Sequence, residues 1–225
     1  MKNIYLVRHG QSEANVDLDV HAHTTDHAIN LTEEGYQQAV RTGQFFREHF
    51  HKLADELGEM PKVRLWVSPY ERTVQTAQGI LENTSDIFGK PFYENFLVEQ
   101  QFGIFDGVPE EEWSTRFPEE FRHYEHVMQH QGKFWVRYPG GESPFDVDIR
   151  TKHFQNTAHR NCKKYNIDHI IVVSHGITTR VLAMRYLHQS YRDYHAEKNP
   201  KNGSVRLLRK VNDDWRDERY IYAGE

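Results

Sequence analysis

Residues 4–10, Ile-Tyr-Leu-Val-Arg-His-Gly, join a short apolar run directly to an arginine and a histidine. A short apolar run that ends at turn-forming residues is typical of a buried strand. Two later segments repeat the pattern: residues 63–67 lead into Ser-Pro-Tyr-Glu-Arg at 68–72, and residues 170–173 lead into Ser-His-Gly at 174–176. Because ligands of open α/β sheets bind outside the carboxyl ends of the strands, we expect four side chains to share one pocket. These are Arg8, His9, Arg72 and His175.

Helices are predicted between these strands. Residues 31–50 carry small and aromatic residues at helical spacing, and Thr32 stands where it would cap that helix. Ser-Pro-Tyr-Glu at 68–71 matches a capping box with proline at the first helical position, so a helix should follow the second strand directly. Further elements are a capped helix from 143–146 to Asn166, a helix over 176–187, and late strands over 204–211 and 219–222.

The alternation of strand and helix predicts an α/β fold. We expect a three-layer α/β/α sandwich with a largely parallel sheet, in a single domain over residues 1–225. Residues 96–140 are interpreted as a helical lid insertion, because charges and aromatic side chains intermingle there without strand alternation. Its aromatic side chains should fill a small core of their own rather than stack on a substrate. His123, His126 and His130 fall at helical spacing and should form a solvated or aromatic-packed face.

The composition restricts the partners of the chain. It has 225 residues and 37% hydrophobic content, enough for one substantial core. Its 33 acidic and 28 basic side chains give a net charge of −5, which argues against a nucleic-acid-binding or anionic-membrane surface. The first apolar run is too short for a signal peptide or a membrane span, and the single Cys162 cannot form an internal disulfide. We therefore expect a cytoplasmic protein that attracts anions only locally.

The predicted pocket has the chemistry of a phosphate site. A guanidinium offers paired donors that match phosphate oxygens, so Arg8 and Arg72 would clamp the anion. His9 would attack phosphorus with a neutral ring nitrogen. His175 would donate to the oxygens over which the charge of the transferred group is spread.

Smaller groups surround these four side chains. Backbone N–H groups near Gly10 and Gly176 would add uncharged donors to the same oxygens. Ser12 and Asn15 either cap and turn the chain after the first strand or contact the ligand. Both alternatives remain open from the sequence.

Glu99 is the candidate acid for the leaving group. An alkoxide departs faster when it is protonated as the bond breaks. The apolar neighbours Phe96, Val98 and Phe102 predict partial desolvation of Glu99, which favours the protonated carboxyl that this step requires.

The polar segment 21–30 has no periodicity and reads as a loop beside the pocket. Its side chains His21, His23, Asp26 and His27 are chemically able to bind a metal. They lack the fixed spacing of a structural zinc site, so no dedicated metal site is predicted. The segment is expected to border the substrate entrance.

The motifs occur in a familiar order. Residues 8–15, Arg-His-Gly-Gln-Ser-Glu-Ala-Asn, resemble the signature of the histidine phosphatase superfamily, the phosphoglycerate-mutase-like proteins. Leu-Thr-Glu-Glu-Gly at 31–35, Ser68-Pro69 with Arg72, Glu99 with Gly103, and Ser-His-Gly at 174–176 follow in that family's order. Arg-Tyr-Pro-Gly-Gly-Glu-Ser at 137–143 and Asn-Pro-Lys-Asn at 199–202 resemble a phosphatase-like subgroup.

The resemblance implies a phosphoglycerate-mutase-like fold and a histidine acid phosphatase-type phosphomonoesterase that needs no metal or other cofactor. A phosphohistidine would form at His9 within a phosphate pocket of Arg8, His9, Arg72 and His175. Glu99 would act first as acid and then as base for water, and Asn15 would touch the phosphate or the substrate, a small phosphorylated metabolite. A backbone carbonyl would orient the other nitrogen of His9.

Two other functions are compatible with this resemblance. Cofactor-dependent phosphoglycerate mutases carry Arg-His-Tyr-Gly after the acidic residue, whereas residues 100–103 here are Gln-Gln-Phe-Gly, which favours hydrolysis. A noncatalytic phosphate-binding domain of the same fold would be expected to show damage to the nucleophile or its clamp, and the sequence shows none.

Overall fold

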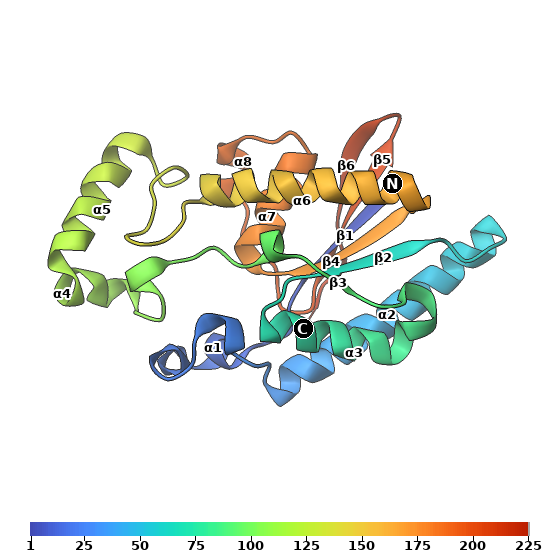
Figure 1. Ribbon diagram of the computed structural model, residues 1–225, viewed down its shortest axis with the longest axis horizontal. Coiled ribbons are helices and arrows are strands. Elements are labelled where there is room, and N and C mark those ends of the chain that lie inside the picture. Colours follow the sequence, from blue (N-terminus) through green and yellow to red (C-terminus); the bar gives the residue numbers. More distant parts are fainter. Residues whose placement is uncertain (225) are drawn as a thin grey trace.

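A six-stranded sheet forms the centre of the molecule (Figure 1). The computed structural model describes residues 1–224. The strands are β1 (Asn3–Arg8), β2 (Val63–Val67), β3 (Phe92–Tyr93), β4 (His169–Ser174), β5 (Val205–Val211) and β6 (Asp214–Tyr222), in the order β3-β2-β4-β1-β5-β6. β1 to β4 are parallel, and β5 and β6 add an antiparallel edge. The predicted largely parallel sheet is confirmed.

The central strands are buried on both faces, which explains why their sequences are continuously apolar. Successive side chains of a strand point to opposite faces of the sheet. In β1, Ile4 and Leu6 join the core on one face, whereas Tyr5 and Val7 join the core on the other. β4 divides in the same way, with Ile170 on the first face. Parallel sheets of α/β proteins are covered by helices on both faces, and this sheet is too.

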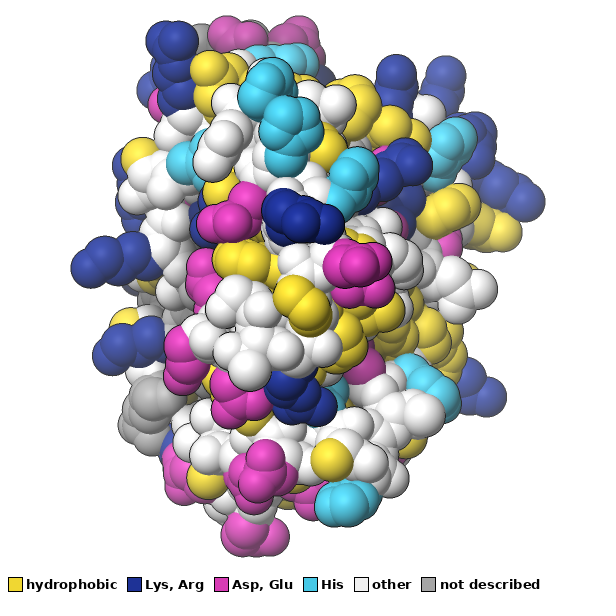
Figure 2. Space-filling view, turned by 90° about the vertical axis from the view of Figure 1, so that its left-hand side faces the viewer, with side chains coloured by type: hydrophobic (Ala, Val, Ile, Leu, Met, Phe, Trp, Pro, Cys, Tyr) yellow, Lys and Arg dark blue, Asp and Glu magenta, His cyan; other side chains and the backbone are white. Residues whose placement is uncertain are grey.

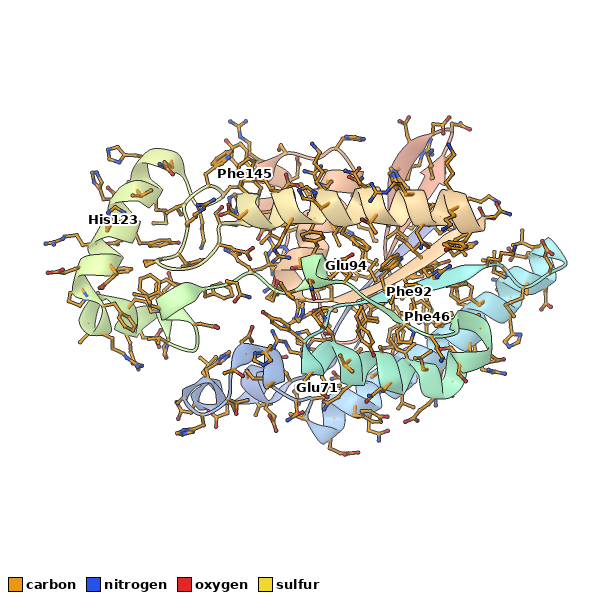
Figure 3. All side chains as sticks on the ribbon, in the orientation of Figure 1. Phe46, Glu71, Phe92, Glu94, His123 and Phe145 are labelled. Carbon is orange, nitrogen blue, oxygen red and sulfur yellow. The ribbon has the colours of Figure 1, made fainter. Side chains whose placement is uncertain are left out.

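The helices form the outer two layers (Figure 1). α2 (Glu33–Leu57) and α3 (Glu71–Phe88) pack on one face of the sheet, and α6 (Pro144–Tyr165) and α7 (Gly176–Tyr186) pack on the other, followed by α8 (Tyr191–Ala196). Phe46 of α2 is fully buried between that helix and the sheet (Figure 3). The three-layer α/β/α sandwich is thus confirmed.

Two of the three predicted helix starts are confirmed, and one is wrong. Thr32 accepts a hydrogen bond from the Gly35 N–H, and Ser143 forms a capping box with Asp146. Ser68, by contrast, does not cap α3, which begins at Glu71 after the N-cap residue Tyr70 (Figure 3). The Ser68 hydroxyl instead lies 2.9 Å from His175 Nε2, a tertiary partner that displaces the local cap.

The segment 96–140, here called the lid segment, is helical as predicted. It begins within the 3₁₀ turn η3 (Asn95–Leu97) and contains two further 3₁₀ turns, η4 (Gly103–Phe105) and η5 (Glu110–Glu112). Two helices follow, α4 (Trp113–Arg116) and α5 (Pro118–Gln131). α4 and α5 lie at the end of the molecule, away from the sheet (Figure 1). Its aromatic side chains form a separate core of Phe105, Trp113, Tyr124 and Val136, as expected.

α5 presents its histidines to solvent. His123, His126 and His130 are exposed, and Figure 2 shows histidine side chains gathered in the upper part of the face where this helix lies. Figure 3 likewise shows His123 pointing outward. The predicted solvated face is confirmed. Across residues 1–224, no helix combines the length and apolarity needed to cross a membrane.

Candidate active site

The carboxyl ends of β1, β2 and β4 meet at one edge of the sheet and open into a cavity of about 440 Å³. The segment after β1, the first turn of α3, the start of α7 and the lid segment all contribute to its walls. Of the predicted site residues, those that line the cavity are Arg8, His9, Ser12, Asn15, Arg72, Glu99 and Gly176. His175 is fully buried, with its ring centroid 5.3 Å from that of His9.

One ring nitrogen of His9 is held by a hydrogen bond, and the other is available to a ligand. Its Nδ1 lies 2.7 Å from the Gly10 carbonyl oxygen, and since a carbonyl can only accept, Nδ1 carries the proton and Nε2 carries the lone pair. Burial lowers the pKa of His9 well below its usual range, and the charges of Arg72 and Arg8 lower it further. The imidazole is therefore neutral and nucleophilic at neutral pH.

His175 has an unpartnered nitrogen in the same place. Its Nε2 is bonded to the Ser68 hydroxyl, whereas its Nδ1 has no hydrogen-bond partner among the described residues. Burial lowers the pKa of His175 well below the usual range, and Arg72 and His9 add to this effect. A buried polar atom without a partner costs free energy, which an oxygen of a bound ligand would recover.

Arg72 is buried and Arg8 is half-buried, and each donates to a backbone carbonyl. Arg8 donates to the Pro200 carbonyl at 2.6 Å, while its Nε has no partner among residues 1–224. Burial lowers the pKa of Arg8, partly offset by the charge of Glu99. Arg72 donates to the Asp26 carbonyl and forms a 2.9 Å ion pair with its carboxylate. The anion expected beside Arg72 is therefore, in this structure, a carboxylate of the protein.

Glu99 lies in a setting different from the apolar one that its neighbours predict. Its Oε1 accepts from the N–H groups of Gln100 and Thr178 and from the Thr178 hydroxyl, at 3.0–3.2 Å. Its Oε2 accepts from the Ile177 N–H at 3.1 Å. The start of α7 thus holds the carboxylate, and Oε2, with a single donor, has a lone pair free for proton transfer.

The Arg-His-Gly turn is fixed by backbone contacts. The Gly10 N–H donates to Thr76 Oγ1 at 3.0 Å, so it is not available to a bound anion, and the prediction that it would be a donor is wrong. A Cβ on Gly10 would overlap the Gly35 carbonyl, and a Cβ on Gly35 would overlap the Gln11 carbonyl. Neither glycine has room for a side chain.

Asn15 serves the turn rather than pointing freely into the cavity. Its Oδ1 accepts from the Ser12 N–H at 3.1 Å and from Asn202 Nδ2 at 3.1 Å. Asn202 also donates to the His9 carbonyl. Ser12 and Asn15 therefore turn the chain, which confirms the first alternative; both also line the cavity, and their contact with a ligand stays a prediction.

Sequence reasoning missed the residues that hold the predicted site in place. Ser68 orients His175, Thr76 fixes Gly10, and Asn202 fixes the backbone of His9. Ser68 lies in one of the quoted motifs and Thr76 in the helix that follows it, but their partners are far away in the chain. For Asn202, the only sequence signal is the resemblance of the Asn-Pro-Lys-Asn segment to a phosphatase-like subgroup.

The segment 21–30 is more ordered than predicted. It contains part of η1 (Leu18–Ala22) and all of η2 (Asp26–Ala28), short 3₁₀ turns that leave no helical periodicity in the sequence. It borders the cavity, as expected, through His21 and Asp26. Within residues 1–224, one group has the chemistry and spacing of metal ligands: His21, Asp26 and Asp106 present atoms within 4.8 Å of one another. His23 and His27 are exposed and lie outside it.

The buried histidines make stability depend on pH. Burial lowers the pKa of His169 to about 4, and the pKa values of His9 and His175 are also lowered. In the unfolded chain these groups titrate at about 6.5, so the unfolded state binds more protons below that pH. The free energy of unfolding should therefore decrease as the pH falls from 6.5 to 5, measured by urea denaturation. His169→Gln should make this dependence shallower; a stability that is constant over the interval contradicts the prediction.

Fold and site together define an α/β protein with a buried, cationic pocket around a neutral histidine. Residues 4–221 match the family model of the histidine phosphatase superfamily (branch 1), and the chain belongs to this superfamily.

Relatives share most of the chain. It is 32% identical to phosphoglycerate mutase-like protein AT74 of Arabidopsis thaliana, over 92% of this chain and 64% of the relative, so it spans just under two thirds of that protein. It is 24% identical to the broad-range acid phosphatase DET1 of Saccharomyces cerevisiae, over 91% of this chain and 84% of the relative.

Solved structures of low identity share the fold. The alpha-ribazole phosphatase from Shigella flexneri superposes with a TM-score of 0.71 at 19% identity, over 99% of this chain and 97% of the other. A mycobacterial glucosyl-3-phosphoglycerate phosphatase superposes with a TM-score of 0.73 at 20% identity, over the full length of both chains.

Proposed function

We propose that this protein is a phosphomonoester hydrolase that acts through a phosphohistidine at His9 on a small phosphorylated metabolite. The observation that carries the proposal is the state of His9: it is buried and neutral, with Nδ1 held by Gly10 and Nε2 unblocked beside two arginines. Such a nitrogen is ready to attack phosphorus.

The reaction divides into two displacements. In the first, Nε2 of His9 bonds to phosphorus as the bond to the ester oxygen breaks, and the leaving alcohol takes a proton from Oε2 of Glu99. In the second, Glu99 removes a proton from water, which attacks the phosphohistidine and releases phosphate. Arg8, Arg72 and His175 Nδ1 stabilise the charge on the transferred oxygens in both steps.

Hydrolysis is favoured over the mutase reaction by the residues after Glu99. Gln100 donates to the Glu142 carbonyl, and Gln101 donates to the Tyr70 hydroxyl. Neither adds a cation to the cavity, which a carboxylate-bearing phosphoglycerate would require.

A trapping experiment tests the proposal. The protein is mixed with a ³²P-labelled phosphomonoester and quenched in denaturant at high pH. We expect label on the protein that is stable to base and lost in acid, as for a phosphoramidate, together with steady release of phosphate. Phosphate exchange between phosphoglycerates without net release would favour the mutase, and no turnover of any phosphoester would favour the noncatalytic domain.

Glu99→Gln should slow esters of poor leaving groups selectively. An amide cannot supply the proton, so kcat for an alkyl phosphate should fall by about 10²- to 10⁴-fold, whereas p-nitrophenyl phosphate, whose leaving group departs unprotonated, should lose far less in its first step. Burst kinetics separate that step from hydrolysis of the intermediate. Glu94→Gln is the control, because Glu94 caps η3 outside the cavity. An equal loss for both esters in the burst phase would rule out Glu99 as the acid.

A further inference from the structure

The cavity wall also carries polar side chains to which the proposed chemistry assigns no step. His21, Asp26 and Asp106 line the cavity, and their ligand atoms lie within 4.8 Å of one another. They come from η1, from η2 and from the residue that follows η4. We call these three side chains the rim cluster.

The rim cluster is built by close packing of the lid segment on η1. Gly107 has a φ of 68°, and a Cβ at this position would overlap the Cβ of His21. The backbone of the lid segment therefore rests directly on His21, next to Asp106. The aromatic pair Phe105 and Trp113, stacked at 4.5 Å, lines the cavity beside it.

Positive and negative side chains lie next to each other in the cavity wall. The arginines that line it are Arg8 and Arg72, which belong to the proposed phosphate site. Asp26 already pairs with Arg72, and among the described residues no lysine or arginine forms an ion pair with Asp106. Burial and the neighbouring Asp26 raise the pKa of Asp106, whereas the charges of His21 and Arg72 lower it.

We propose that the rim cluster binds a positively charged ammonium group on the alcohol part of the substrate, so that the preferred substrates are phosphomonoesters of amino alcohols. This inference rests on the proposed hydrolase function. Asp106 attracts the charge, His21 and Asp26 offer further acceptor atoms, and Phe105 and Trp113 line the same cavity. A second anionic group on the substrate would instead meet Asp26 and Asp106 and be repelled.

An ammonium group fits the rim cluster better than a resident divalent ion. Asp26 shares its carboxylate with the Arg72 guanidinium at 2.9 Å, so the remaining carboxylate of the cluster, that of Asp106, is balanced by a single positive charge. The cluster lies in the same cavity as the phosphate site, so one molecule can contact both.

Charge-matched substrate pairs test the proposal. Phosphocholine is compared with 3,3-dimethylbutyl phosphate, its uncharged carbon analogue, and phosphoethanolamine with propyl phosphate, all in the presence of EDTA. We expect kcat/KM to favour the ammonium ester of at least one pair by about 10-fold or more. Asp106→Asn should reduce that ratio to about 1–3 while kcat/KM for the uncharged ester changes less than about twofold. Asp19→Asn, an exposed carboxylate of η1 outside the cavity, should leave the ratio unchanged.

The outcomes separate the two proposals. The ammonium proposal is wrong and the hydrolase stands if the uncharged esters are hydrolysed and the kcat/KM ratio between ammonium and uncharged ester is near 1 for both pairs. The same conclusion follows if Asp106→Asn leaves a high ratio unchanged. If neither these esters nor p-nitrophenyl phosphate is hydrolysed, the hydrolase itself fails. If calorimetry shows tight Zn²⁺ or Mn²⁺ binding that Asp106→Asn removes, the rim cluster is a metal site and the ammonium proposal is wrong.

Discussion

Replacing His9 by alanine is expected to abolish both phosphate release and labelling of the protein by substrate phosphate. The variant keeps Arg8, Arg72 and the unpaired Nδ1 of His175, so it should still bind phosphate while lacking the atom that forms the covalent bond. Loss of a nucleophile that acts with its neighbours as a unit costs about 10⁴-fold or more in kcat. A chromogenic phosphomonoester assay and the ³²P-trapping experiment measure the two losses.

Two further variants make this result interpretable. His9→Gln keeps an amide N–H donor for the Gly10 carbonyl and much of the side-chain volume, so it should fold like the parent and remain inactive. His123→Ala removes an exposed histidine of α5 and should leave both activity and labelling unchanged. Retained labelling in His9→Gln would place the covalent phosphate on another residue and end the mechanism proposed here.

Arg206→Met is expected to lower the free energy of unfolding by about 3–5 kcal/mol. The Arg206 side chain is 4% exposed and pairs with Glu197 at 2.6 Å and with Asp217 at 2.7 Å. Burial alone lowers the pKa of Arg206, but the hydrogen bonds to Asp217 and the charges of both carboxylates outweigh it and raise the pKa above the usual value. Methionine would leave the largely buried carboxylate of Glu197 without a cation among the described residues, and that of Asp217 with the exposed Arg219 alone, at 3.4 Å.

Arg209→Met is the matched control from the same strand. Arg209 is half exposed and lies 3.6 Å from Glu218, so its loss should change the free energy of unfolding by no more than about 1 kcal/mol. Urea denaturation at pH 7 measures both variants. Equal losses in the free energy of unfolding at the two positions would show that the contribution of the Arg206 ion pairs to stability does not depend on their burial.

The sequence alone predicts the strands and helices that depend on interactions between neighbouring residues. The strands at 4–7 and 170–173 and the helices capped by Thr32 and Ser143 follow from runs and caps a few residues long, and the structure contains them. Segment 21–30 is predicted as a loop because its short 3₁₀ turns have no periodic apolar face. Its contact with Arg72 depends on the tertiary fold.

The remaining errors concern side chains with distant partners. Ser68 has the local pattern of a helix cap, but its hydroxyl bonds to His175, 107 positions away. Glu99 has apolar neighbours in sequence, but the start of α7 supplies the donors that hold its carboxylate. Gly10 has a backbone N–H at a strand end, but Thr76 occupies it. Local sequence patterns predict which residues come together at the site. Which of their atoms are free to bind a ligand depends on hydrogen bonds to residues that are distant in the sequence.

The contact between Gly10 and Gly35 joins the proposed nucleophile to a helix of the outer layer. Main chain rests on main chain there, so the position of His9 is coupled to the start of α2, and any enlargement of either residue displaces the nucleophile. His21 and Asp106, by contrast, line the cavity with their side chains, and a substitution there leaves this main-chain contact in place. Substitutions in the cavity wall are therefore expected to alter which substrates fit, whereas substitutions at Gly10 or Gly35 are expected to alter the reaction itself.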